Sequence, residues 1–411
     1  MIRSKKFIYL QTMRIITRTI LILSLVSLFA DVASEMLYPI IPVYLKEIGF
    51  SIMWIGILEG FVNFTAGISK GYFGKLSDEK GVRLPFVKLG YFLSALSKPL
   101  IGFFVGPVWI FFVRTLDRLG KGVRVAAKDA LLSSETTKTN KAKVFGFNRA
   151  LDTAGATIGP VIALIFLLSY PGEYKTLFTL AFIPGIISVL LIFLLKEKKQ
   201  PASTMEKGNF FSFFKYWKIA TKEYKALVAG LLLFALFNSS DVFLLLKTKE
   251  TIGDDTIKIL DSTFNSDTIT IAAYIFYNLV WALGSYPLGI LADKIGYKKI
   301  FLSGLVLFAI VYAGFAFNPS IATIFILFSV YGLFSAATDG VSKAWITNIA
   351  HNKNTATAVG FYTSCQSICT LGASTIAGLV WEQLGSFYTF FSTAAVAFIV
   401  FVFLLLKLKN E

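Results

Sequence analysis

The chain has 411 residues and a formal net charge of +16, with 55% hydrophobic and only 16% charged residues. Soluble domains carry about a quarter charged residues, so this composition excludes a water-soluble enzyme and a disordered chain. Two cysteines and one histidine also exclude a disulfide framework and a structural zinc site. The positive excess is therefore expected on cytoplasmic loops that face anionic lipid, rather than on a nucleic-acid surface.

Apolar residues come in blocks of roughly 20, the length that an α-helix needs to cross a bilayer. The blocks predict an all-α integral membrane protein with twelve transmembrane helices. The first block is not a signal peptide, because it contains Asp31 and Glu35 and lacks a small-residue cleavage pattern. The expected spans are 19–45, 52–73, 84–106, 108–132, 144–169, 174–195, 225–247, 269–291, 298–317, 321–346, 355–381 and 387–406.

Lysine and arginine residues gather on one side of these spans. They are dense before the first span, within 196–224 and after the eighth span, whereas the opposite loops are nearly free of them. The positive-inside rule then places both termini and the 196–224 linker in the cytoplasm. Short loops and a lysine-rich linker suit a multi-pass protein of a bacterial inner membrane.

The linker 196–224 separates two six-helix halves, an N-terminal bundle at 1–195 and a C-terminal bundle at 225–411. Its aromatic residues favour an amphipathic helix at the membrane surface, and a solvated linker is the open alternative. A repeat relates the halves, since residues 74–83 read G-K-L-S-D-E-K-G-V-R and residues 289–298 read G-I-L-A-D-K-I-G-Y-K. Parallel halves related by an axis along the membrane normal are a transporter architecture.

These residues resemble the major facilitator superfamily (MFS), whose loop between the second and third spans has the pattern G-x-L-a-D-r-x-G-r-k. Both copies match it, although Glu79 replaces a base in the first copy. The fifth span is similar to the family's G-x8-G-x3-G-P pattern, which implies an antiporter. That pattern is met by Gly146, Gly155, Gly159 and Pro160. The resemblance implies two pseudo-symmetric six-helix bundles.

A glycine-flanked aspartate at a helix end can cap the free N–H groups of the next helix and pair with a base across the interface between the halves. Such a contact would latch one of two rocking states. Glycines in the fifth span allow close helix approach, and Pro160 permits a bend, with simple close packing as the alternative. The gating candidates are Gly74, Asp78, Arg83, Asp129, Arg149, Asp152, Gly289, Asp293 and Lys298, with Lys128 expected beside Asp129.

Ionisable residues inside spans are candidates for function, because each costs about 2.5–3.5 kcal/mol at the bilayer centre. Asp31 and Glu35 are four residues apart on one face of the first span, and Glu59 and Lys98 lie at a similar depth to Glu35. Carboxylates crowded around one lysine suit proton binding, and a structural ion-pair cluster is the open alternative. The proton-coupling candidates are Asp31, Glu35, Glu59 and Asp241.

The fourth span carries bases at helical spacing, which must face the protein interior or a water-filled path. Arg118 and Lys121 lie nearest the midplane and are expected to bind an anionic group of a substrate. Asp339 and Lys343, four residues apart, are expected to satisfy each other. The remaining substrate-binding candidates are Lys98, Asn238, Tyr274, Tyr277, Asn278, Tyr331, Asp339 and Gln366.

The sequence predicts a secondary active transporter that moves a small molecule by alternating access, through proton-coupled antiport or efflux. A proton-coupled uptake permease for an organic anion is the alternative, and a non-transporting membrane receptor or scaffold is the alternative from another class. The sequence contains no phosphate-cradling G-x-x-x-x-G-K-[ST] loop and no catalytic constellation, so an ATP-driven pump or an enzyme is not expected. The expected partners are the substrate, protons and the lipid bilayer, for a monomer without cofactor, metal or nucleic acid.

Overall fold

The computed structural model describes residues 16–38, 40–49, 52–104, 106–170, 172–197, 209–238, 241–253, 257–259, 262–264, 266–317, 319–350 and 352–407. The first half contains α2 (Arg18–Glu35), α3 (Ile40–Glu47), α4 (Ile52–Lys80), α5 (Leu84–Leu100), α6 (Pro107–Ser134), α7 (Lys141–Ser169) and α8 (Tyr174–Phe193). The connecting segment contains the 3-10 helix η1 (Phe210–Lys215) and α9 (Tyr216–Ile219).

The second half repeats this order and adds a short 3-10 helix and a hairpin. It contains α10 (Lys222–Ala235), α11 (Val242–Ile252), α12 (Ser266–Ile295), α13 (Tyr297–Ala316), α14 (Ile321–Ile349), the 3-10 helix η2 (Asn352–Asn354), α15 (Thr355–Leu384) and α16 (Ser386–Lys407). The hairpin is antiparallel and consists of β1 (Ile257–Ile259) and β2 (Ser262–Phe264) between α11 and α12. The sequence analysis expected no strands, but β-branched and aromatic side chains alternate in this short segment and suit a hairpin.

The first and seventh spans are each split into two helices, α2 with α3 and α10 with α11. Counted in this way, the described helices form the predicted twelve-span bundle. Length and hydropathy alone identify six described helices as able to cross a membrane, namely α7, α8, α12, α13, α14 and α16. Charge explains why α6 is not among them, because it carries Arg114, Arg118, Lys121, Arg124 and Lys128.

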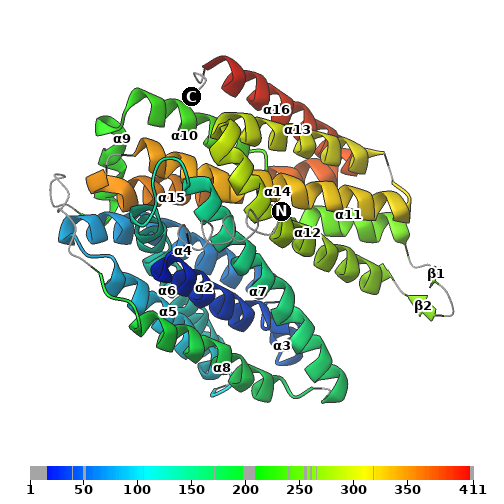
Figure 1. Ribbon diagram of the computed structural model, residues 1–411. Helices are drawn as coiled ribbons and strands as arrows, with labels where there is room; N and C mark the ends of the chain where they lie inside the picture. Colours follow the sequence, from blue (N-terminus) through cyan, green and yellow to red (C-terminus); the bar gives the residue numbers. More distant parts are fainter. Residues whose placement is uncertain are drawn as a thin grey trace, which may run out of the picture.

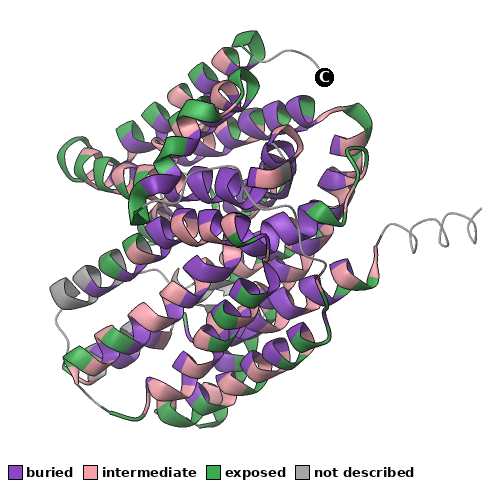
Figure 2. Cartoon of the chain, turned by 90° about the vertical axis from the view of Figure 1, so that its left-hand side faces the viewer, coloured by how far each residue is buried: buried purple, intermediate pink, exposed green. Residues whose placement is uncertain are grey.

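The two halves meet along two helix pairs, α4 with α15 and α7 with α12. In Figure 1 helices α2 to α8, coloured blue to green, form one bundle and helices α10 to α16, coloured green to red, form the other, and in Figure 2 the buried residues gather inside the bundles and between them. Close approach depends on glycine at both crossings. A Cβ atom at Gly74 would lie 2.5 Å from the Ala356 carbonyl oxygen, and one at Gly146 would collide with the Ser285 carbonyl oxygen.

The described part of the linker packs on the protein rather than lying free. Phe213 is fully buried against Gly71, and the ring of Trp217 stacks on Phe361 with centroids 5.6 Å apart. Lys75 Nζ donates to Ser212 Oγ at 2.8 Å. The buried aromatic residues of η1 and α9 therefore pack on α4 and α15, while Phe211 and Ile219 of the same segment are exposed. This packing differs from a solvated linker.

Candidate functional site

Three cavities meet at Thr370 of α15. The largest, called here the vestibule, has a volume of about 570 Å³ and a mostly apolar wall that includes Glu35, Tyr38 and Tyr274. The walls come from α2, α3 and α7 of the first half and from α11, α12 and α15 of the second. A cavity between the two halves is where a transporter of this architecture binds its substrate.

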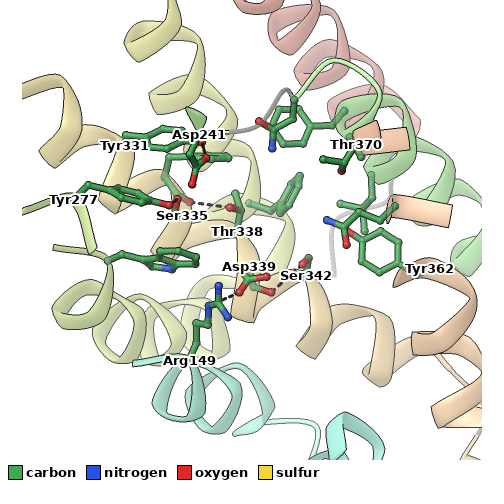
Figure 3. A pocket seen from close by; sticks show the side chains of 18 residues that line it. Arg149, Asp241, Tyr277, Tyr331, Ser335, Thr338, Asp339, Ser342, Tyr362 and Thr370 are labelled. Carbon is green, nitrogen blue, oxygen red and sulfur yellow. Dashed lines mark hydrogen bonds and ion pairs between the residues drawn. The ribbon is translucent and has the colours of Figure 1, made fainter. Parts of the chain in front are cut away.

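The second cavity, the aromatic chamber, has a volume of about 180 Å³ and is built mainly by the second half (Figure 3). Tyr331 donates a hydrogen bond to Asp241 Oδ1 at 2.6 Å, and its ring stacks on Tyr277 with centroids 4.9 Å apart. The buried Oδ1 of Asn238 has no hydrogen-bond partner. Asn238 and Asp241 line both this chamber and the vestibule, so they offer acceptors to a polar group of a substrate.

The third cavity, the basic chamber, has a volume of about 430 Å³ and is lined by Lys70, Arg118 and Lys121. Lys70 Nζ donates to Ser367 Oγ of the other half at 3.4 Å. No carboxylate is among the described residues that line this chamber, so it suits an anionic group. Lys70 was missed by the sequence analysis, although a lysine inside the predicted span 52–73 was the signal that could have found it.

Asp31 lies directly beside the basic chamber. It lines a small pocket together with Arg118, Lys121 and Arg124, and Arg118 and Lys121 also line the basic chamber. Asp31 and Glu35 are the carboxylates that interact electrostatically with Lys121. The structure therefore brings the first-span carboxylates to the fourth-span bases, whereas the side chain of Glu59 lies outside the described residues.

Lys98 lies away from the central cavities. Its Nζ donates to Asp117 Oδ1 at 2.8 Å, and both side chains are buried. Lys98 was expected among the carboxylates Glu35 and Glu59, but its described ion pair is with Asp117, while the side chain of Glu59 lies outside the described residues. The reason is packing, because Gly90 and Gly120 let α5 and α6 approach so closely that Lys98 meets its partner on the neighbouring helix.

Lys128 lies in the interior of the first half rather than at the gate. Its Nζ donates to Ser27 Oγ at 2.7 Å and to Asn148 Oδ1 at 3.2 Å, and it lies 3.6 Å from Asp152 Oδ2. The helical spacing of the fourth-span bases gave the depth of Lys128 along the helix, but it did not show which neighbouring helices its side chain faces. The expectation of a gating contact for Lys128 is corrected accordingly.

Two ion pairs join the halves, and one of them lies in the wall of the aromatic chamber. Arg149 Nε pairs with Asp339 Oδ2, and Lys343 Nζ lies 3.3 Å from Asp129 Oδ2. The guanidinium of Arg149 also lies over the ring of Trp281, 4.2 Å from its centroid. Asp339 and Lys343 were expected to satisfy each other, but each one binds a residue of the first half instead.

The two motif aspartates cap helices of the opposite half. Asp78 Oδ2 accepts hydrogen bonds from the backbone N–H of Thr357 at 2.7 Å and from its hydroxyl at 2.9 Å, at the first turn of α15. Asp293 accepts from the backbone N–H groups of Ala142 at 2.9 Å and Lys143 at 2.7 Å, at the first turn of α7. These pseudo-symmetric contacts, called here the two latches, join the halves at one end of the molecule.

Other details of the gate differ from expectation. The motif aspartates do not cap the next helix in sequence, since Glu197 accepts from the backbone N–H groups of Arg83 and Leu84 at the start of α5. Arg83 Nη2 lies 3.5 Å from Asp78 within the same half. Lys298 donates to the carbonyl of Leu405 near the end of α16 and takes no part in a latch.

The contacts between the motif aspartates and the opposite half close one end of the molecule, and the vestibule lies toward the other end. The latches, Gly74 and Gly289 lie at the end where α7 and α15 begin. The vestibule is lined by Pro160 and Leu167, near the opposite end of α7. Gln366 lines both the basic and aromatic chambers, while Asn278 lines the vestibule. Most substrate-binding candidates therefore line one of the three cavities, which share lining residues such as Thr370.

A family model and the sequences of known proteins both match this chain over most of its length. The model of the Major Facilitator Superfamily matches residues 23–260 and 256–411. An uncharacterized MFS-type transporter of Methanocaldococcus jannaschii is 33% identical over 371 residues, which cover 90% of each chain. The multidrug resistance protein MdtG of Escherichia coli O9:H4 is 24% identical over 283 residues, covering 67% of this chain and 66% of that protein.

The fold of a solved structure is also similar. The Escherichia coli fucose:proton symporter FucP superimposes with a TM-score of 0.75 at 12% identity, covering 95% of this chain and 98% of that one. A structure of FucP in the outward conformation gives the same TM-score, 0.75, at 12% identity and covers 96% of this chain and 100% of that one. The chain therefore belongs to the major facilitator superfamily and is a multi-pass membrane transporter.

Proposed function

We propose that this transporter moves a small organic anion together with a proton, by alternating access between its two halves. The observation that carries the proposal is that Asp31 and the basic chamber share Arg118 and Lys121. An ionised Asp31 offsets the charge of these bases, and an anion bound in the chamber competes for the same bases. Anion binding therefore favours protonated Asp31, and by linkage a proton on Asp31 favours anion binding.

The rest of the cavity supports a substrate with an apolar body. The vestibule is mostly apolar, and the aromatic chamber next to it is lined by Tyr277, Trp281 and Tyr331. Aromatic faces and apolar walls accommodate apolar rings, while a few placed polar groups fix orientation. A relative named for multidrug resistance and a neighbour named as a proton symporter fit an amphiphilic substrate and proton coupling.

The direction in which protons cross the liposome membrane when the substrate enters tests the proposal. Purified protein in liposomes with a trapped pH dye is exposed to naphthalene sulfonate, an acid too strong to carry a proton across the bilayer itself. We expect the lumen to acidify, because anion and proton enter together. Asp31→Asn should abolish this acidification yet leave exchange of the sulfonate measurable, whereas acidification at the wild-type rate in Asp31→Asn would contradict the proposal.

Proton-coupled efflux by antiport is the second candidate, and the carboxylates of the cavity favour it. Glu35 and Asp241 line the vestibule, where a cationic substrate would compete with protons for the same oxygens. Ethidium, a permanent cation, added outside the same liposomes should then alkalinise the lumen. Loss of this signal in Glu35→Gln and Asp241→Asn, with no response to the sulfonate, would establish antiport instead.

We also propose that the closed end faces the cytoplasm, so that the structure is outward-facing. The basic linker and the positive-inside rule support this orientation. After replacement of Cys365 and Cys369 by serine, Ser203→Cys should resist an impermeant maleimide added to intact cells. Gly172→Cys in the opposite loop is the matched control that should react. Ser203 itself lies outside the described residues.

A further inference from the structure

A separate cavity lies at the closed end, away from the central cavities. This gate pocket has a volume of about 400 Å³ and is lined by Arg83, Ser133, Lys138 and Lys141 of the first half and by Asn348 and Thr355 of the second, among others. None of its described lining residues is a carboxylate. Three bases thus converge on this space, and one of them, Arg83, also lies 3.5 Å from the latch carboxylate of Asp78.

Lys141 is the residue that makes this pocket unusual. Its side chain is only 8% exposed, and its Nζ donates to two neutral oxygens, Ser133 Oγ at 3.0 Å and the Thr347 carbonyl at 3.2 Å. Within the described part of the chain, it makes no ion pair. A buried charge without a counter-charge is costly, so a structure that retains one at a cavity wall favours an anion there.

The other strongly buried lysines of the described chain show how this one differs. Four of these five lysines have a carboxylate within ion-pair distance. Lys75 pairs with Glu79 at 2.7 Å, Lys98 with Asp117 at 2.8 Å, Lys128 with Asp152 at 3.6 Å and Lys247 with Glu250 at 3.3 Å. The fifth, Lys298, donates to the Leu405 carbonyl near the end of α16. Lys141 therefore differs from the four paired lysines, because it has no carboxylate partner among the described residues.

The remaining walls supply donors of the kind that bind oxyanions. Hydroxyl groups line the pocket at Ser133, Ser134, Thr136 and Thr137, and the guanidinium of Arg83 has one N–H bonded to the Ala130 carbonyl at 3.1 Å. The Oδ1 atom of Asn348 is buried and has no partner, and a turned amide would present N–H groups instead. Arginine, lysine and hydroxyl donors around one space match a tetrahedral phosphate group.

We propose that the gate pocket binds a phosphate group, as inorganic phosphate, a phosphomonoester or a lipid headgroup. Its walls come from both halves, so the complete pocket exists only while the two latches are closed. A ligand that binds one conformation better than another shifts the population toward it. Phosphate at this site therefore holds the transporter closed at the end that faces the cytoplasm in the orientation proposed above, and slows its cycle.

The test measures gate closure in the full chain. In a background with Cys365 and Cys369 replaced by serine, Thr139→Cys and Lys294→Cys place one thiol on each half, outside the pocket lining. The rate at which a short bismaleimide joins them reports the closed population. Inorganic phosphate should raise this rate and the melting temperature of detergent-purified protein, whereas chloride at equal ionic strength should not.

Two variants separate the site from a general charge effect. Lys141→Met should raise the phosphate concentration that gives a half-maximal response by roughly tenfold, as expected for loss of a charge-assisted contact. Ser133→Ala, which keeps the charge, should weaken it less and guards against a folding defect in the first variant. Lys299→Met removes an exposed charge on the same face and should leave the response unchanged.

Lipid vesicles distinguish the sources of phosphate. If the headgroup is the ligand, phosphatidylglycerol vesicles should raise crosslinking without added phosphate, and phosphatidylcholine vesicles with a shielded headgroup should not. A response to inorganic phosphate in phosphatidylcholine identifies a soluble ligand. The proposal is overturned if neither phosphate nor phosphatidylglycerol changes the crosslinking rate, or if Lys141→Met responds like the parent protein.

Discussion

The first half of the molecule buries ion pairs where the second half buries aromatic rings. In the first half, Lys98 pairs with Asp117 and Lys128 with Asp152, all four of them buried. In the second half, the ring of Tyr331 stacks on Tyr277 and Phe334, and Phe308 stacks on Tyr312. The same helix order thus encloses two different interiors.

This difference shows that two copies of one fold can bury chemically different side chains. Buried charges are retained where each has a partner, and they can be redistributed when a proton or an anion arrives. Stacked rings fill volume and present flat apolar faces without long-range charge. The latches, by contrast, are alike in both halves, since Asp78 and Asp293 each cap a helix of the opposite half. The contacts of the motif aspartates between the halves are therefore symmetric, whereas the interiors of the two halves are not.

The largest effect is expected from breaking a first-half ion pair. Lys98→Met leaves Asp117 buried without its nearest base, which costs about 3–5 kcal/mol of unfolding free energy when a buried pair is broken. Thermal unfolding in detergent measures the loss. Lys98→Met combined with Asp117→Leu should recover most of the stability, and a double variant as unstable as the single one would show that the charges are not what holds α5 to α6.

The helix crossing at Gly146 should be the next most sensitive site. Gly146→Ala places a Cβ atom against the Ser285 carbonyl oxygen, and overpacking of this kind costs up to about 3 kcal/mol. This contact forms at the closed end, so the variant should destabilise the closed conformation. Crosslinking between Thr139→Cys and Lys294→Cys should therefore slow, and transport should drop. Gly106→Ala, where a Cβ atom meets open space, should behave like the parent protein.

The latches provide the sharpest test of symmetry. Asp78→Asn and Asp293→Asn each weaken two charge-assisted hydrogen bonds, and we expect about 2 kcal/mol less stability of the closed end in each variant. Transport should fall while substrate affinity changes little, because both residues lie far from the chambers. Crosslinking at the closed end measures the shift, and unequal shifts in the two variants would break the proposed symmetry.

The smallest effect is expected in the aromatic chamber. Tyr331→Phe removes the hydrogen bond to Asp241 but keeps the ring stack, so unfolding should become easier by about 1.5 kcal/mol. Thermal unfolding beside Lys98→Met gives the direct comparison between the halves. If Tyr331→Phe destabilises the protein as much as Lys98→Met does, the contrast between a charged and an aromatic half does not hold energetically.

The sequence alone determined the twelve spans, the repeat and the family, because apolar block length and motif spacing are local properties of the chain. Counting along the helices also placed Asp31, Arg118 and Lys121 near mid-depth, since helical periodicity gives depth and face, but it did not bring Asp31 together with the two bases. Only the tertiary structure decided which helix each face meets. In the folded protein Lys98 pairs with Asp117 and Lys343 pairs with Asp129. Asp78 caps a helix of the other half.

The physical reason lies in where those partners come from. A buried charge must be paired, but its partner is chosen by helix packing between segments far apart in sequence. Asp78 and Thr357 are 279 residues apart, and Lys70 and Ser367 are 297 apart. No local pattern encodes such a pairing, so the contact of Lys70 with Ser367 and the gate pocket around Lys141 became visible only in the tertiary structure, where the glycine-lined crossings bring the two halves together.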